Sequence, residues 1–95
     1  MLKLSVTSLL RYLKNKLDTD DNLQRIYVVG EISNFHRHNS GHLYFTLKDE
    51  SSAISCVMFK SSASSLNFEP KTGDKVLILA NTSIFEVLKY YVEEL

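Results

Sequence analysis

The sequence has very few of the residues that constrain a chain covalently or conformationally. Its 95 residues include one cysteine, one proline, three glycines and no tryptophan. A single cysteine cannot form a disulfide within the chain, so a disulfide-stapled secreted fold is excluded. Cys56 lies in an apolar run rather than beside basic residues that would activate its thiol, which favours a role in core packing.

The chain also has no net charge, because eleven basic residues balance eleven acidic ones. A heavily basic domain that neutralises many phosphates is therefore excluded, and any nucleic-acid binding is expected to be local and weak. There is no run of about eighteen apolar residues and no signal-peptide layout at the start. With 44% apolar and 23% charged residues, we expect one globular domain over 1–95, cytoplasmic and without a membrane partner.

Hydrophobic spacing predicts a helix at the start of the chain and three strands after it. Apolar residues follow helical spacing from Val6 to Leu17, with Ser5 or Thr7 as the N-cap, so a helix over about 5–17 is expected. An acidic, polar run over 18–22 ends it. Alternation of apolar and polar residues predicts strands over 25–35, 42–49 and 53–59, joined by a polar loop over 35–41 and a turn over 50–52.

The rest of the chain predicts two further strands. Residues 61–68 are read as a short helix or loop, a turn follows around Pro70 and Gly73, and strands are expected over 75–85 and 90–94. Mainly β structure of this kind fits a five-stranded Greek-key barrel of the OB type over about 24–95. The first helix would cap the barrel, and a short helix would link strands three and four.

The connection between the last two strands fits this fold poorly. A tight hairpin needs residues that tolerate positive φ, and the segment from Phe85 to Tyr90 has neither glycine nor asparagine. We therefore expect either an unusual turn or a flexible hairpin tip that is missing from this sequence.

Several segments together resemble one known family. They are LSVTSL from Leu4, GEISNF from Gly30, SGHLYFTLKD from Ser40, CVMF from Cys56 and YVEEL from Tyr91. In combination these segments resemble the N-terminal OB domain of exonuclease VII large subunits, from one end of the chain to the other. Ser55, where the family often has a basic residue, and the absence of a glycine-containing hairpin before YVEEL depart from the pattern.

The resemblance implies a function for the longer protein. It implies the single-stranded DNA-binding front end of a bacterial exodeoxyribonuclease, a hydrolase that degrades single strands from either end without a divalent metal and contains several small subunits. Family members carry their catalytic residues in the domain after the OB fold, so no catalytic residue, cofactor or metal is expected here. The expected partners are single-stranded DNA, the remaining domains of the large subunit and the small subunit.

One short segment holds the candidate binding residues. Between Ser33 and Lys48 lie all three histidines, Arg37 and three aromatic residues, but no carboxylate. OB folds bind single strands on the outer surface of strands two and three and on the flanking loops. The predicted nucleic-acid-binding residues are Phe35, His36, Arg37, His38, His42, Tyr44, Lys48 and Phe59.

The alternation of strand residues assigns different roles to the aromatic side chains. Tyr44 has the parity opposite to Leu43, Phe45 and Leu47, so it should face outward and stack on a base, while Phe45 should be core. Phe59 is either a second stacking platform or packing against the first helix. Arg37 and Lys48 would bind phosphates, with Lys60 as a weaker candidate; the alternative for each is a solvated surface charge.

The histidines have three possible roles, which are nucleic-acid contacts, metal ligation or polar loop residues. A zinc site needs three or four converging ligands, which a His-x-His pair on a loop plus one more histidine does not supply. As nucleic-acid contacts they would gain charge beside phosphates, so weak acidity should strengthen binding. Gly41 is expected in the turn itself and Gly30 at a bend of strand one.

We do not expect the acidic residues of the same region to form a catalytic pair. Glu31 lies on a different strand from Asp49 and Glu50, which adjoin a turn, so all three are read as turn or strand-end charges.

Two other functions stay open on the sequence alone. The domain could be mainly an assembly module, which its charge neutrality favours. It could also be an anticodon-type RNA-binding domain, because Tyr44, Leu47, Lys48 and Asp49 resemble an aromatic-x-x-Leu-Arg-Asp pattern of some tRNA synthetases.

Overall fold

A computed structural model describes residues 1–84 of the chain. The chain divides into two compact units. Of the described residues, the helical unit contains Met1–Tyr27 and Leu79–Ile84, and the sheet unit contains Val28–Ile78. The expected strand over 90–94, the doubtful connection from Phe85 to Tyr90 and the YVEEL segment lie outside the described residues.

The helical unit begins with α1, Val6–Asp18, which confirms the helix predicted over about 5–17. Ser5 is the N-cap, and its hydroxyl oxygen accepts a hydrogen bond from the Ser8 N–H at 3.1 Å, which satisfies one of the unpaired donors of the first turn. At the other end, the Thr19 hydroxyl donates to the Asn15 carbonyl at 2.7 Å. In the described part of the chain, no helix combines the length and apolar character needed to cross a bilayer.

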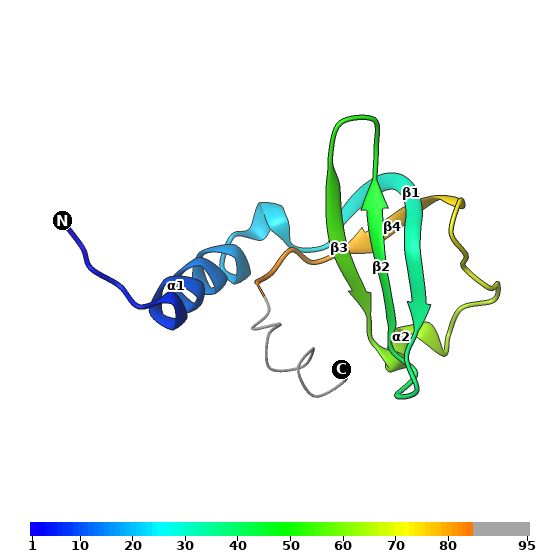
Figure 1. Cartoon of the computed structure of the whole chain (residues 1–95), viewed down its shortest axis with the longest axis horizontal. Coiled ribbons are helices and arrows are strands. Elements are labelled where there is room, and N and C mark those ends of the chain that lie inside the picture. Colours follow the sequence, from blue (N-terminus) through cyan, green and yellow to red (C-terminus); the bar gives the residue numbers. More distant parts are fainter. Residues whose placement is uncertain (85–95) are drawn as a thin grey trace. The chain divides into compact units, whose positions relative to one another are not determined.

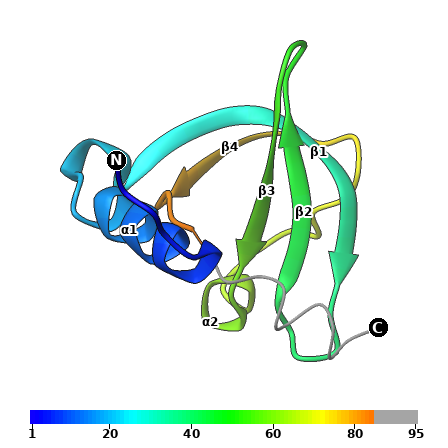
Figure 2. The same cartoon turned by 60° about the vertical axis from the view of Figure 1, so that its left-hand side comes forward.

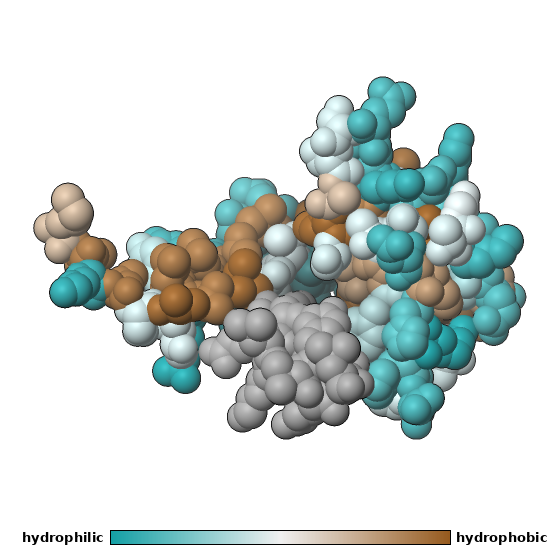
Figure 3. Space-filling model, in the orientation of Figure 1, coloured by the Kyte–Doolittle hydropathy of each residue, from teal (hydrophilic) through white to brown (hydrophobic). Residues whose placement is uncertain are grey.

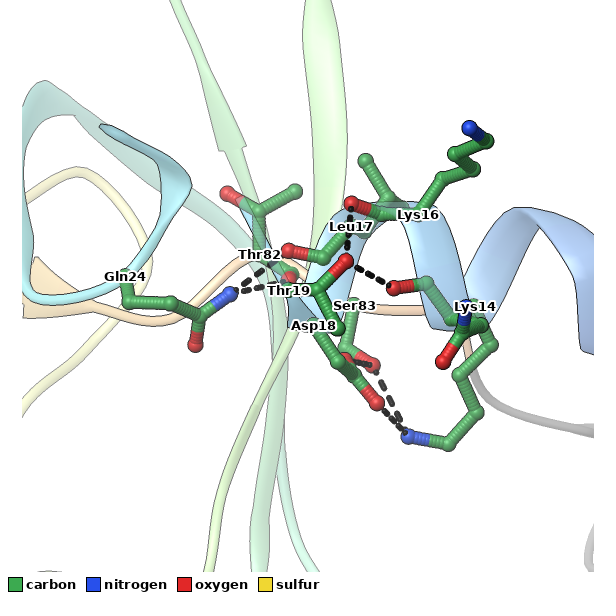
Figure 4. Close-up of polar contacts among 9 residues, drawn as sticks. Lys14, Lys16, Leu17, Asp18, Thr19, Gln24, Thr82 and Ser83 are labelled. Carbon is green, nitrogen blue, oxygen red and sulfur yellow. Dashed lines mark hydrogen bonds and ion pairs between the residues drawn. The ribbon is translucent and has the colours of Figure 1, made fainter. Parts of the chain in front are cut away.

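Polar contacts hold the C-terminal end of α1 to residues that follow the sheet (Figure 4). The Asp18 carboxylate accepts hydrogen bonds from Lys14 and, at 2.8 Å, from the Ser83 hydroxyl. These two bonds lower the pKa of the Asp18 carboxyl. The Gln24 amide donates to the Leu17 carbonyl at 2.9 Å and to the Thr82 carbonyl at 3.4 Å. Asp18 at the end of α1 and Gln24 therefore make the polar contacts to Ser83 and Thr82, and a short 3-10 turn, η1, lies between them over Asp21–Leu23.

The apolar stripe of α1 is exposed. No residue of the helix is buried, and Val6, Leu9 and Leu13 are 72%, 45% and 39% exposed. Brown, apolar side chains accordingly gather on the face of α1 seen in Figure 3. The spacing that predicted a helix was correct, but the stripe covers no core in the described chain.

The sheet has four strands in the order β3-β2-β1-β4 (Figure 1). These strands are β1 (Ile26–Arg37), β2 (Leu43–Lys48), β3 (Ala53–Met58) and β4 (Lys75–Ala80). Neighbours β1 and β2, and β2 and β3, pair antiparallel. A short helix, α2 (Lys60–Ala63), follows β3. The mainly β fold and the short helix are confirmed, whereas a fifth strand and a closed barrel are not established within residues 1–84.

Several predicted boundaries were wrong. The first strand continues to Arg37 instead of ending at Phe35, because its pairing with β2 extends through His36 and Arg37. The connecting loop is therefore shorter than the predicted loop over 35–41. The third strand ends at Met58 because Phe59 is the N-cap of α2, and β4 ends at Ala80, not at Phe85.

A β-bulge interrupts β1, which curves along its length (Figure 2). The register with β2 shifts between Ser33 and His36, and Asn34 has a φ of 52°. One extra residue reverses the alternation of side chains beyond it. The turn before β4 binds this irregular segment, since the Phe35 N–H donates to the Thr72 hydroxyl at 3.1 Å. Phe35 consequently packs against the core.

The core is small and lies on one face of the sheet. Its buried residues are Ile32, Leu43, Phe45 and Leu47. The predicted inward parity of β2 is therefore confirmed. Cys56 packs against this core, as expected, and its partial burial raises the pKa of its thiol. A shallow, mainly apolar pocket of about 300 Å³ lies beside the core, lined by Val28, Leu47 and Ile54 among others.

Gly30 lies where β1 passes close to β2. A Cβ at this position would lie 2.8 Å from Leu47 Cγ and 2.9 Å from the Lys48 carbonyl oxygen. The glycine therefore permits a close approach of β1 to β2, which no other residue would allow without displacement.

Candidate nucleic-acid interface

The register of the three-stranded segment β1–β2–β3 defines its outer face. Tyr44 lies opposite His36 on β1 and opposite Val57 on β3. Directly opposed residues in antiparallel strands project from the same face. Because Leu43, Phe45 and Leu47 are buried on the inner face, Tyr44 and its two partners occupy the outer face, as the alternation predicted.

Three rings form a contiguous cluster on this face, which we call the ring cluster: His36, His38 and Tyr44. The centroids of His38 and Tyr44 are 6.2 Å apart with an interplanar angle of 90°. Those of His36 and His38 are 6.3 Å apart at 63°. Edge-to-face contacts of this kind hold rings in place through their quadrupoles. Residues from the strand and from the loop are thus brought together around Tyr44.

His42 and Phe59 form a second ring contact. Their centroids are 5.5 Å apart and the rings are nearly perpendicular, at 89°. Phe59 is 48% exposed, so it packs on a histidine while keeping much of its surface accessible. From the sequence, Phe59 had two possible roles, a stacking platform or packing against the first helix. Its contact with His42 is compatible with a stacking platform beside the loop between β1 and β2.

The loop between β1 and β2 is a tight turn closed by backbone hydrogen bonds. The Gly41 N–H donates to the His38 carbonyl, and the His38 N–H donates to the His42 carbonyl, both at 2.9 Å. Gly41 has a φ of 95°, a region that residues with a Cβ rarely adopt. The predicted turn role of Gly41 is therefore confirmed.

In two of the histidines, a ring nitrogen accepts a hydrogen bond from a backbone N–H group. The Ser40 N–H donates to His38 Nδ1 at 3.0 Å, and the Lys60 N–H donates to His42 Nδ1 at 2.8 Å. A nitrogen that accepts a hydrogen bond carries no proton, so each neutral ring has its N–H at Nε2.

The predicted cations are paired with carboxylates. Arg37 lies opposite buried Leu43, away from the parity of Tyr44, and its Nη2 is 2.9 Å from Glu69 Oε2. Lys48 lies on the outer face, where its Nζ is 3.7 Å from Glu31 Oε2. Exposed pairs of this kind contribute little to stability. They do, however, reduce the positive charge that a phosphate would meet.

The predicted site residues are therefore divided among three places. The ring cluster and Lys48 share the outer face, His42 and Phe59 meet beside the loop, and Arg37 is turned toward Glu69. Phe35 differs most from expectation, because the bulge turns it toward the core. The lone signal for this in the sequence was Asn34, a residue that tolerates positive φ more readily than most.

Asp49 lies in the turn between β2 and β3, as expected, whereas Glu31 lies within β1 opposite Lys48 and not at a strand end. Asp49 Oδ1 accepts hydrogen bonds from the N–H groups of Ser51 and Ser52, both at 2.9 Å. These bonds lower the pKa of the Asp49 carboxyl. Within residues 1–84, no three His, Cys, Asp or Glu side chains converge in a group that could hold a metal ion.

Comparison with known proteins gives two matches. Residues 4–91 match the family described as OB-fold nucleic acid binding domain. The chain is also 58% identical, over 83 residues, to the exodeoxyribonuclease 7 large subunits of Staphylococcus aureus strains Newman, JH1 and Mu3. This alignment covers 87% of the chain but only 19% of each relative. The resemblance noted from the sequence is confirmed, and the chain spans about a fifth of the length of these relatives.

Proposed function

Because the chain belongs to the family of OB-fold nucleic acid binding domains, we propose that it binds single-stranded DNA on the outer face of β1, β2 and β3. Its likeness to exodeoxyribonuclease 7 large subunits supports single-stranded DNA, rather than RNA or duplex DNA, as the ligand. The domain then captures single strands and feeds them to a nuclease domain of the same longer protein.

The ring cluster is the observation that carries this proposal. Tyr44 projects from the outer face beside His36 and His38. Each base of a single strand exposes a π-face, and stacking on an aromatic side chain contributes about 1 to 3 kcal/mol per base with little dependence on sequence. A nuclease that degrades any single strand needs recognition of this kind.

The proposed setting extends the family resemblance to the whole protein. In the longer protein the partners are the remaining domains of the large subunit and the small subunit, and the location is the cytoplasm. Within this chain the residues act by binding, and hydrolysis belongs to residues elsewhere in the protein.

The test is fluorescence anisotropy of labelled oligonucleotides with the purified domain across a salt series. We expect single-stranded DNA to bind, with affinity that falls as salt rises. Tyr44→Ala should lose about 1 to 3 kcal/mol of binding free energy. Tyr12→Ala is the matched control, because Tyr12 is an exposed tyrosine of α1 and not part of the proposed face.

Two further oligonucleotides separate the alternatives. Duplex DNA should bind more weakly, because its bases are not available for stacking. RNA of the same sequence should show no advantage, whereas a clear preference for RNA would indicate recognition of the 2′-hydroxyl and an anticodon-type domain. Equal effects of Tyr44→Ala and Tyr12→Ala would contradict the proposed site.

An assembly module is the second candidate, and the exposed stripe of α1 favours it. Leu9 and Leu13 leave apolar surface uncovered in the described chain, and such surface often marks a protein contact. Leu9→Lys and Leu13→Lys, made in the full-length subunit, should then impair complex formation by size-exclusion chromatography. Under this reading Tyr44→Ala would leave assembly unchanged.

A further inference from the structure

The cations of the sheet unit differ in whether a carboxylate already neutralises them. Between Val28 and Ile78 they are Arg37, Lys48, Lys60, Lys71 and Lys75. Arg37 pairs with Glu69, Lys48 with Glu31, and Lys71 with Asp74 at 2.9 Å. Lys60 and Lys75 pair with no carboxylate of residues 1–84. Lys75 begins β4, whereas Lys60 begins α2 and is hydrogen-bonded to His42 at the end of the β1–β2 loop. A phosphate can therefore approach Lys60 without displacing an ion pair.

Lys60 is also placed beside the ring-bearing loop. A Cβ on Gly41 would lie 3.0 Å from Lys60 Cγ and 3.1 Å from Lys60 Cδ. The aliphatic stem of Lys60 thus passes directly over Gly41, in the space that the glycine leaves open. The stem contacts the turn that carries His38 and His42, while the ammonium group at its end can remain in solvent.

His42 holds the backbone that carries this lysine. Its Nδ1 accepts the Lys60 N–H at 2.8 Å, and its ring packs edge-on against Phe59, the residue before Lys60. These two contacts attach the start of α2 to the end of the hairpin. Without them, the connection from β3 to α2 would lose its main side-chain link to the loop.

We propose that Lys60 is the phosphate-binding cation of this interface and that His42 positions it, an inference that rests on the proposed binding of single-stranded DNA. A lysine ammonium acts as a point charge with rotatable donors, which suits a phosphate whose orientation varies along a flexible strand. His42 acts through its acceptor nitrogen and ring packing rather than as a cationic contact.

The first experiment removes the charge of Lys60. With labelled oligodeoxythymidine in a salt series, Lys60→Gln should weaken binding about two- to fivefold. It should also reduce the slope of log affinity against log salt by about 0.7, the value for one phosphate contact on a single strand. Lys75→Gln is the control, since Lys75 lies in the same unit and carries the same charge; it should alter neither quantity.

The second experiment separates the two features of His42. His42→Asn keeps an acceptor near the position of Nδ1 and should retain most of the slope, while His42→Phe keeps a ring against Phe59 but loses the acceptor. His42→Phe should reduce the slope as Lys60→Gln does, and combining the two should cause no additional loss. Circular dichroism and urea denaturation verify that each variant is folded.

The outcomes distinguish this inference from the proposed function. If the wild-type domain binds and Lys60→Gln has unchanged affinity and slope, Lys60 is not the phosphate contact and the inference is wrong. If His42→Phe weakens binding further in the Lys60→Gln background, His42 contacts DNA directly and does not act through Lys60. If the wild-type domain binds no single strand at low salt, the proposed function itself is overturned, and the inference with it.

Discussion

At the scale of single residues, the three histidines show that one side chain can take different roles within a few positions. His38 and His42 accept backbone hydrogen bonds at Nδ1 and so form part of the loop and of its link to α2. His36 instead faces its strand partner Tyr44 and contacts the His38 ring. Composition located the cluster, but only the hydrogen bonds distinguish a structural imidazole from an outward-facing one.

The tautomers of His38 and His42 can be measured directly. The neutral form of each ring should carry its proton at Nε2, because Nδ1 accepts an N–H in each. Long-range ¹H–¹⁵N correlation spectra distinguish the two nitrogens. A spectrum in which either ring is mainly protonated at Nδ1 would contradict the hydrogen bonds described for it.

The Asp49 carboxylate should make the stability depend on pH in the acidic range. The hydrogen bonds from Ser51 and Ser52 hold the pKa of Asp49 below its ordinary value. A depressed folded pKa contributes stability above the unfolded pKa of about 3.9, and this stability is lost as pH falls through the folded pKa. The difference in unfolding free energy between wild type and Asp49→Ala should therefore be constant above about pH 5 and shrink below pH 4.

Urea denaturation at a series of pH values measures this difference. Glu50→Ala controls for removal of a carboxylate from the same turn. A difference between wild type and Asp49→Ala that persists unchanged below the folded pKa would show that the Asp49 charge does not stabilise the turn.

At the scale of elements, periodicity located the strands correctly but missed the bulge in β1. Strand alternation is a local property, and it predicted the inward faces of β2 and β3. The bulge depends on a residue 37 positions away, because Thr72 accepts the Phe35 N–H and the turn before β4 also bonds to Ile32. No local pattern reports such a partner, so the inward orientation of Phe35 was not predictable.

The close approach of β1 to β2 makes Gly30 intolerant of substitution. Gly30→Ala would place a Cβ 2.9 Å from the Lys48 carbonyl oxygen, a backbone atom that cannot rotate away. The cost should be about 1 to 3 kcal/mol of unfolding free energy, as for other overpacked positions. Thermal and urea denaturation provide the measurement.

Ser55→Ala, in an exposed position of β3, is the control for this substitution and should change stability by less than about 0.5 kcal/mol. If Gly30→Ala were as stable as Ser55→Ala, β1 and β2 could move apart at this position with little loss of unfolding free energy.

At the scale of the whole molecule, residues 1–84 bury few side chains completely, and the full sequence carries no net charge. Ile32, Leu43, Phe45 and Leu47 are its buried apolar residues. A small core makes each of its members a large part of the total stability, which for a protein domain is about 5 to 15 kcal/mol. Charge neutrality, in turn, means that binding depends on where a few cations lie and on whether they are paired.

Leu43, which is 1% exposed, tests the dependence on this core. Leu43→Ala should lower the unfolding free energy by about 2 to 5 kcal/mol, through the lost burial and the cavity left behind. Leu77→Ala removes the same atoms from a side chain that is 62% exposed, and it should cost less than about 1 kcal/mol. Similar urea midpoints for the two variants would refute this account of the core.

The sequence by itself determined the first helix, the four described strands, the inward face of β2 and the turn at Gly41, because each depends on residues close together in the chain. It left Ser5 and Thr7 as alternative N-caps of α1, and the structure selects Ser5. The family membership also followed from short motifs read together. Tertiary structure decided which residues of the segment from Ser33 to Lys48 remain accessible. Phe35 is turned inward by Thr72, Arg37 is engaged by Glu69, and His42 is bound by Lys60. Those partners are distant in sequence, and hydrogen bonds and ion pairs form only between groups that the fold brings within a few ångströms.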